Sequence, residues 1–296
     1  MTKLFVYISL ILGFTVSSYA NQQLIGPEDS LKTSLLWEIK GKKVKSPSYI
    51  LGTMHLISQE KFLFPDHLKE KVKSSDLLVM EIGGISEQME MAKLLFLEEG
   101  NLFDHFTEEQ TDSILNFVEE NLNMSKEQVK STFGRMKPMA LIQLFSRESF
   151  GESPASYEMS LEKIAKEHEI EVRGLETVEE QMAIFDSMTM EDQVKMVMQA
   201  LRDSDESAKA TDRLIEVYLS QDIEKIYELL GEEGGDMMNY EENLLTNRNQ
   251  NWIPQIKKLI KKNKSFIAVG AAHLGGENGV INLLRKEGYE VVPVKL

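Results

Sequence analysis

Short apolar runs of strand length occur near both ends of the chain, and amphipathic segments fill the middle. Residues 34–56 predict two strands joined by a basic turn around Gly41. The run DLLVMEI (76–82) is too apolar and too short for a surface helix, so it predicts a buried strand. The C-terminal part predicts a strand, a helix and a strand over 265–273, 278–287 and 289–294.

Helical periodicity and capping patterns dominate the middle of the chain, apart from one short predicted strand at 171–176. Thr107, Ser125 and Thr177 each precede Glu or Gln by three residues, which is the pattern of a capping box. The expected helices begin at Pro65 or Asp66 and at Ser125, and further ones cover 107–122, 138–145, 157–170, 178–188, 190–203, 206–219, 222–230 and 241–262.

This order of elements predicts an α/β fold. We expect a mixed sheet built from the N- and C-terminal segments, because strands at both ends must share a core. The helical insertion, about residues 100–262, is expected to cover one side of that sheet. Together these parts would form a single domain over residues 21–296.

The first 20 residues have the pattern of a secretory signal peptide. One lysine precedes the apolar run LFVYISLILGFTV, and SSYA then places Ser18 and Ala20 at the small-residue positions of a cleavage site. We therefore expect a periplasmic or secreted protein cleaved near Ala20, with no stable membrane span afterwards. An uncleaved anchor is the alternative, although the run is short for one.

Composition narrows the range of partners and ligands. The 296 residues carry a net charge of −15, which disfavours nucleic acid and anionic membranes as partners. The chain has no cysteine, so a metal site would have to use His, Asp, Glu, amide or water ligands.

Two predicted strands end in the same way, in Gly-x-x-His. YILGTMHL places Gly52 and His55 after one apolar run, and FIAVGAAHL places Gly270 and His273 after another. Ligands of open α/β sheets bind beyond the carboxyl ends of the strands, and glycine permits close backbone approach there. The alternative is a pair of structural histidines at strand ends.

Glu81 follows the apolar run Leu77–Met80 directly, where burying a carboxylate is costly unless it is paired or bound to metal. If the three strands are parallel neighbours, then His55, Glu81 and His273 meet at one edge of the sheet. Such a set suits a divalent metal with open positions, or water activation by a histidine base without metal. Glu81 pointing to solvent is the third possibility.

Four further residues are candidates for supporting roles. Glu176 ends the short predicted strand in RGLET, and Arg248 and Asn249 lie within a predicted helix. Arg248 can pair with a buried carboxylate or an oxyanion. Glu158 begins a helix and can simply favour its dipole. The sequence contains no HExxH, Walker or G-x-S-x-G motif, so the commonest motif-based enzyme classes are not indicated.

Taken together, these segments resemble the TraB/GumN family, which includes the Tiki proteins of animals. The resemblance extends over nearly the whole chain after the first 20 residues, with Gly275 as a departure where many members have Pro. The matching segments occur in the family's order: LGTMHL, LLVMEI, YEMSLEKIAKEHEIEVRGLETVEEQ, LLTNRNQNWIPQI and FIAVGAAHLGGENGVINLLRKEGYEVVPV.

The resemblance implies an erythromycin-esterase/ChaN-like fold. It also implies metal-dependent peptidase activity with manganese or cobalt favoured and zinc possible, because Tiki proteins are described as such peptidases. Their two Gly-x-x-His motifs and a Glu correspond to His55, His273 and Glu81, and the family's Arg-Asn pair corresponds to Arg248 and Asn249. Bacterial members are named after polysaccharide gene clusters and peptide-pheromone shutdown.

Three functional hypotheses follow. The first is an exported metal-dependent hydrolase, a peptidase by resemblance, in which Arg248 stabilises developing negative charge. The second keeps the site without metal, with a histidine base and an orienting Glu acting on an ester or another small molecule. The third is a protein that binds a peptide, haem or a polysaccharide precursor without chemistry.

Overall fold

Six strands form one mixed sheet in the order β6-β4-β7-β2-β1-β8. The structure is a computed structural model, and it describes residues 33–84, 87, 90, 93–122, 124–148, 154–202, 204–233 and 240–296. β6, β4, β7 and β2 are parallel neighbours, whereas β1 is antiparallel to both β2 and β8. The strands are β1 (Leu36–Lys40), β2 (Ser48–Thr53), β4 (Leu77–Met80), β6 (Glu171–Gly174), β7 (Ser265–Gly270) and β8 (Glu290–Val294). The predicted mixed α/β fold is confirmed.

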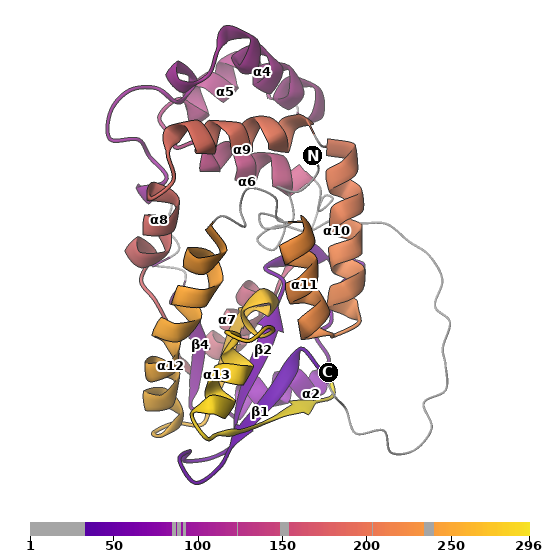
Figure 1. Ribbon diagram of the computed structural model, residues 1–296, viewed down its shortest axis with the longest axis vertical. Coiled ribbons are helices and arrows are strands. Elements are labelled where there is room, and N and C mark those ends of the chain that lie inside the picture. The colour runs from indigo at the N-terminus through magenta and orange to yellow at the C-terminus, as the bar shows by residue number, and fades with distance from the viewer. Residues whose placement is uncertain are drawn as a thin grey trace.

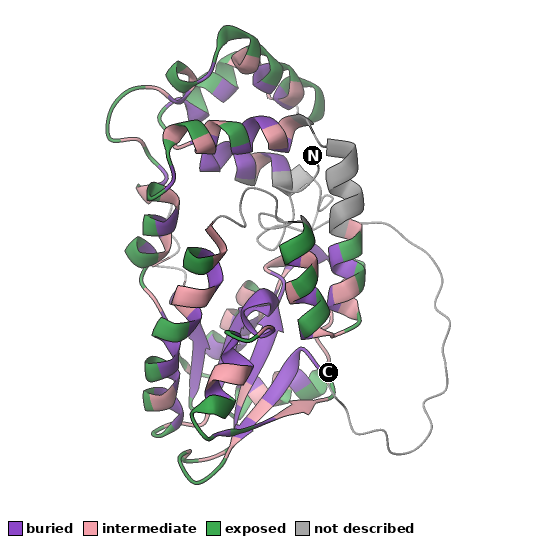
Figure 2. Ribbon diagram, viewed as in Figure 1, coloured by how far each residue is buried: buried purple, intermediate pink, exposed green. Residues whose placement is uncertain are grey.

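Helices cover both faces of the sheet (Figure 1). Alternate residues of a strand point to opposite faces, so Leu78 packs in one core and Val79 in the other. α2 (Asp66–Lys73) and α7 (Tyr157–Glu167) contribute to the first core, and α12 (Asn247–Ile260) and α13 (Val280–Lys286) to the second. Figure 2 shows the central strands buried and the outer surfaces of these helices exposed.

The helical middle is arranged differently from the expected cover on one side. It supplies α7 to one face and α12 to the other, and it returns to the sheet at β6. Figure 1 shows α4, α5, α6 and α9 gathered at the end of the molecule farthest from β1. The remaining α-helices of the described residues are α4 (Glu108–Leu122), α5 (Lys126–Phe133), α6 (Met139–Glu148), α8 (Val178–Asp186), α9 (Met190–Arg202), α10 (Ser204–Leu219) and α11 (Ile223–Glu233).

Local sequence signals account for the helix ends. Ser125 and Thr177 form the predicted capping boxes, and the side chains of Thr107 and Gln110 exchange the same pair of hydrogen bonds. A π-helical turn at Glu242–Thr246 leads into α12.

Among the described residues, no helix is long and apolar enough to cross a membrane. The predicted signal peptide, residues 1–20, lies outside the described residues and stays a prediction.

A second, two-stranded sheet was not predicted. β3 (Leu56–Ser58) pairs antiparallel with β5 (Pro154–Ser156), so that Leu56 lies opposite Ser156. β3 begins directly after His55, and α7 begins directly after β5. This pairing therefore carries the start of α7 to the end of β2.

Candidate functional site

The carboxyl ends of four parallel strands lie side by side and carry the predicted residues. Thr53 of β2 pairs with Gly270 of β7, and Met80 of β4 pairs with Gly174 of β6. Each strand is followed within three residues by a candidate side chain, in the spatial order Glu176, Glu81, His273 and His55. The condition under which His55, Glu81 and His273 were expected to meet at one edge, that their strands are parallel neighbours, is therefore met.

His55 forms a dyad with Glu158 at the end of β2. Its Nδ1 lies 2.9 Å from Oε1 of Glu158, which also accepts a hydrogen bond from the hydroxyl of Thr53. Ser156 donates to the other carboxylate oxygen, so the acceptor is fixed from two sides. The His55 side chain is 30% exposed, and within the described residues its Nε2 has no hydrogen-bond partner. One ring nitrogen is thus held and the other is available.

The dyad sets the protonation of His55. Burial by itself lowers the pKa of this imidazole, but the Glu158 carboxylate outweighs it and raises the pKa of His55 to about 9. The same pairing lowers the pKa of Glu158 against the effect of its own burial. His55 and Glu158 are therefore an ion pair at neutral pH.

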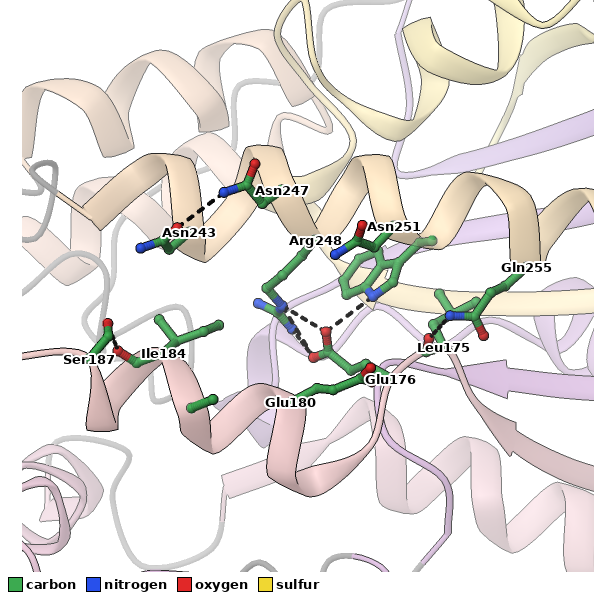
Figure 3. Close-up of a pocket in the computed structure, with 12 residues that line it drawn as sticks. Leu175, Glu176, Glu180, Ile184, Ser187, Asn243, Asn247, Arg248, Asn251 and Gln255 are labelled. Atoms are coloured by element: carbon green, nitrogen blue, oxygen red, sulfur yellow. Dashed lines mark hydrogen bonds and ion pairs between the residues drawn. The ribbon is translucent and has the colours of Figure 1, made fainter.

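Arg248, from the start of α12, joins Glu81, Glu176 and His273 into a buried cluster. Figure 3 shows its bonds to Glu176. Its Nη2 donates to Glu81 at 2.7 Å and to Glu176 at 2.6 Å, and its Nε also donates to Glu176. Its Nη1 donates to the carbonyl of Leu244 and to Nε2 of His273. All five N–H groups of the guanidinium are therefore engaged.

His273 is held in one tautomer by its neighbours. The Asn249 amide donates to the carbonyl of Asn278, so its oxygen faces the Nδ1 of His273 at 2.7 Å and accepts from it. Nε2 is then the unprotonated nitrogen and accepts from Arg248 at 3.2 Å. Burial and the charge of Arg248 lower the pKa of His273 to about 3. His273 is neutral, whereas His55 is charged.

The two buried carboxylates differ from each other. Burial raises the pKa of Glu81, but the charge of Arg248 outweighs it and holds that pKa well below its ordinary value. Glu81 also accepts the backbone N–H of Gly270 at 2.7 Å. Burial raises the pKa of Glu176 in spite of its bonds to Arg248 and to the indole of Trp252.

The two glycines of the repeated motif allow close approach, as expected. A Cβ on Gly52 would lie 2.8 Å from the Leu274 side chain and 3.0 Å from the Cα of Ala271. A Cβ on Gly270 would lie 3.3 Å from the Glu81 carboxylate. Both positions therefore favour glycine because larger residues would push the strand ends away from the site.

The residues in this arrangement do not fit a metal ion at the predicted ligands. Arg248 and Gly270 donate to the Glu81 oxygens, Arg248 donates to Nε2 of His273, and His55 faces Glu158. Among the described residues, no three His, Asp or Glu side chains converge on a point that could hold a metal. The expected manganese, cobalt or zinc ion stays a prediction, and binding it here would require Arg248 to move.

Some contacts of the site had no clear signal in the sequence. Glu158 was a candidate only for its place at a helix start, and its partner His55 lies 103 residues earlier. Gln181 of α8 donates to Glu176 at 3.1 Å, and Trp252 packs against His273 with ring centroids 4.5 Å apart and ring planes tilted by 44°. A Ser immediately before the helix, at position 156, was the one local hint that Glu158 is fixed in place.

Comparison with known proteins identifies a family over nearly the whole chain. The profile of the TraB/PrgY/gumN family matches residues 35–293, which include all six strands except the last residue of β8. The chain belongs to the TraB/PrgY/gumN family. No match was found among curated proteins or among solved structures. The TraB/PrgY/gumN match leaves the reaction and the ChaN-like resemblance of the fold as predictions.

Proposed function

We propose that this protein is a hydrolase that cleaves an acyl bond, with His55 as the base that activates water. The observation that carries the proposal is the dyad of His55 and Glu158, open at one ring nitrogen and lying at the carboxyl edge of a parallel sheet. A carboxylate that holds one imidazole nitrogen while the other faces the reaction is a recurrent arrangement in hydrolases. Family resemblance favours a peptide bond as the target and an ester or another small molecule as the alternative.

The chemistry needs only a water and the substrate carbonyl beside His55. In its neutral form the imidazole accepts a proton at Nε2 from water as the water oxygen bonds to the acyl carbon. Glu158 holds the Nδ1–H and stabilises the imidazolium that forms. The protonated Nε2 then gives its proton to the leaving amine or alkoxide as the old acyl bond breaks.

The buried cluster acts as support in this proposal. All five N–H groups of Arg248 are engaged by protein atoms, which favours a positioning role over the expected stabilisation of a substrate oxyanion. Arg248 ties Glu81, Glu176 and His273 together, and so holds the ends of β4, β6 and β7 at fixed distances. The surface that faces the substrate keeps its shape because of these bonds.

Metal-assisted hydrolysis is the second candidate. The Nε2 of His273 and the Oε1 of Glu81 are 3.8 Å apart. Two atoms bound to one ion at about 2.0–2.2 Å can be separated by such a distance. This candidate requires that Arg248 leave its present position. It predicts activity that depends on added metal, whereas the first candidate predicts activity without metal.

The test is hydrolysis of fluorogenic peptides and of p-nitrophenyl esters by the purified protein, with EDTA and with added Mn²⁺. The proposal expects turnover that EDTA does not abolish and a loss of about 100-fold or more in His55→Ala, since a general base contributes on that order. His67→Ala is the matched control, because His67 is an exposed histidine outside the site. Full activity of His55→Ala would refute the proposal, and activity only with Mn²⁺ would favour the second candidate.

Export is a separate part of the proposal. The predicted signal peptide supports a periplasmic or secreted protein. N-terminal sequencing of the protein recovered from cell fractions tests it, with a new N-terminus after Ala20 in the periplasm or the medium as the expected result.

A further inference from the structure

A pocket lies between α8 and α12, on the outer side of the buried cluster (Figure 3). Its volume is about 590 Å³, within the range of about 300–1,000 Å³ found for ligand pockets. Arg248 and Glu176 form part of its wall, and they bond to each other there. The pocket thus reaches the cluster at the strand ends from the β6 side.

Four amide side chains line this pocket from one helix. They recur at every fourth position of the π-helical turn and α12: Asn243, Asn247, Asn251 and Gln255. In an α-helix four residues advance about 6 Å and turn only about 40° beyond a full circle. The amides therefore form a row along the helix, which we call the amide row.

The spacing of the amide row is close to that of an extended polypeptide. Two residues of an extended chain span about 6.6–6.8 Å, against about 6 Å for one step of the row. Within α12, the eight residues from Asn247 to Gln255 cover about 12 Å, which equals about three or four extended residues. A carboxamide offers two donors and one acceptor, so it can bond to both the N–H and the C=O of a peptide unit.

Part of the hydrogen-bonding capacity of the row is unused by the protein. Asn247 donates to Asn243 at 3.1 Å, and Gln255 donates to the carbonyl of Leu175. Within the described residues, the oxygens of Asn247 and Gln255 and both polar atoms of Asn251 have no protein partner. These groups belong to three successive members of the row and are free to bond a ligand.

The opposite wall and the charge of the pocket restrict the ligand further. α8 presents Ala183 toward the pocket and Ser187 follows at the end of that helix, whereas Glu180 and Ile184 are the larger α8 residues of this wall. Arg248 is shared between Glu176 and Glu81, and Glu180 also lines the pocket without an ion pair among the described residues, so this wall carries a net negative charge and disfavours an anionic ligand. The amide groups at a regular spacing match the repeating amides of a polypeptide main chain.

We infer that the amide row binds an extended polypeptide segment by its main chain. The inference rests on the proposed function in one respect, since it names the bound segment as part of a peptide substrate. Binding through main-chain groups tolerates many side chains, so the site would fix the path of the substrate rather than its sequence. The side chains bound beside α8 would add limited selectivity through the space that Ala183 and Ser187 leave.

The experiment measures binding of a fluorescein-labelled, end-blocked hexapeptide of alternating Thr and Ala by fluorescence polarisation, in the His55→Ala background so that the peptide is not consumed. The same peptide with alternate amides N-methylated should bind about tenfold or more weakly, because it loses two or three main-chain donors. Asn251→Ala should weaken the unmethylated peptide about threefold to tenfold. Gln250→Ala is the matched control, because Gln250 is exposed on the same helix outside the pocket and should change nothing.

The outcomes separate this inference from the proposed function. The inference is overturned if the hexapeptide does not bind, if the N-methylated peptide binds equally well, or if Asn251→Ala and Gln250→Ala behave alike. A neutral oligosaccharide that displaces the peptide and binds more tightly also overturns it. Because polarisation is read immediately on mixing, before the peptide can be hydrolysed, full activity of His55→Ala would refute the catalytic proposal while leaving the amide row as a peptide site. Equal melting temperatures of the two variants exclude misfolding as the cause.

Discussion

Replacing Glu158 by Gln should change the titration of His55 more than that of any other histidine. Glutamine keeps an oxygen that can accept from the Nδ1 of His55 and from Thr53, but it removes the negative charge. The pKa of His55, raised to about 9 by that charge, should fall to below its ordinary value of 6.5, because burial and the charge of Arg248 lower it and only the weaker effect of Glu81 still raises it. At neutral pH the imidazole would then change from charged to neutral.

The expected size of the effect follows from the same shift. The difference between 6.5 and about 9 corresponds to about 3 kcal/mol at 1.36 kcal/mol per pKa unit. The 30% exposure of the side chain makes this an upper value, since solvent screens the pair. A raised pKa means that the folded state holds the proton more tightly than the unfolded chain. The contribution to stability is therefore fully present below pH 6.5 and is lost as the pH rises toward 9.

Two measurements check this prediction. Long-range ¹H–¹⁵N NMR spectra follow the five histidines against pH, and His55→Ala assigns the signal of His55. In urea unfolding, the free energy of unfolding of the native protein should decrease as the pH rises from 6 to 9.5. The same decrease should be absent in Glu158→Gln. The reasoning is refuted if His55 titrates at or below 6.5 in the native protein, or if Glu158→Gln leaves its pKa unchanged.

Three further predictions concern activity, the buried cluster and the strand ends. If His55 is the base, kcat/KM should rise with pH up to about 9 in the native protein and level off below 6.5 in Glu158→Gln; a native profile that falls over this range would contradict the assignment. Arg248→Ala should lower the free energy of unfolding in urea by about 3–5 kcal/mol, since it leaves the buried carboxylates of Glu81 and Glu176 unpaired. The same variant should bind Co²⁺, which absorption spectra would show. A decrease in the free energy of unfolding of less than about 1 kcal/mol would contradict the role given to Arg248. Gly52→Ala should lower the free energy of unfolding, measured by thermal denaturation, by about 1–3 kcal/mol, because the new Cβ would meet the backbone of Ala271. Gly231→Ala is the control, because a Cβ at Gly231 meets open space and should not lower the stability.

The sequence predicted the strand ends well because two independent signals agree there. Apolar runs located β2, β4 and β7, and a polar residue with special chemistry followed each run. Parallel strands then place such residues at one edge. Pairing with a buried carboxylate was one of the two roles considered for Arg248, and the structure pairs it with two carboxylates.

The remaining parts of the site could not be predicted from the sequence, because their contacts produce no periodic pattern of apolar and polar residues. β3 and β5 have three residues each, too few for an alternating pattern, yet their pairing brings Glu158 to His55. The amide row was equally hidden, because exposed polar residues at every fourth position are typical of any solvent-facing helix. The pocket beside the amide row exists because α8 lies next to α12 in the folded protein, and the sequence pattern of α12 alone does not show this.

The central place of β7 has a consequence for how the chain is made. β7 lies between β2 and β4, which do not pair with each other, although about 190 residues of chain are synthesised between β4 and the end of β7. Until β7 leaves the ribosome, β2 and β4 each present an unpaired apolar edge. The sheet therefore closes as one of the last events of synthesis, and a chaperone that covers strand edges has its longest opportunity during that interval.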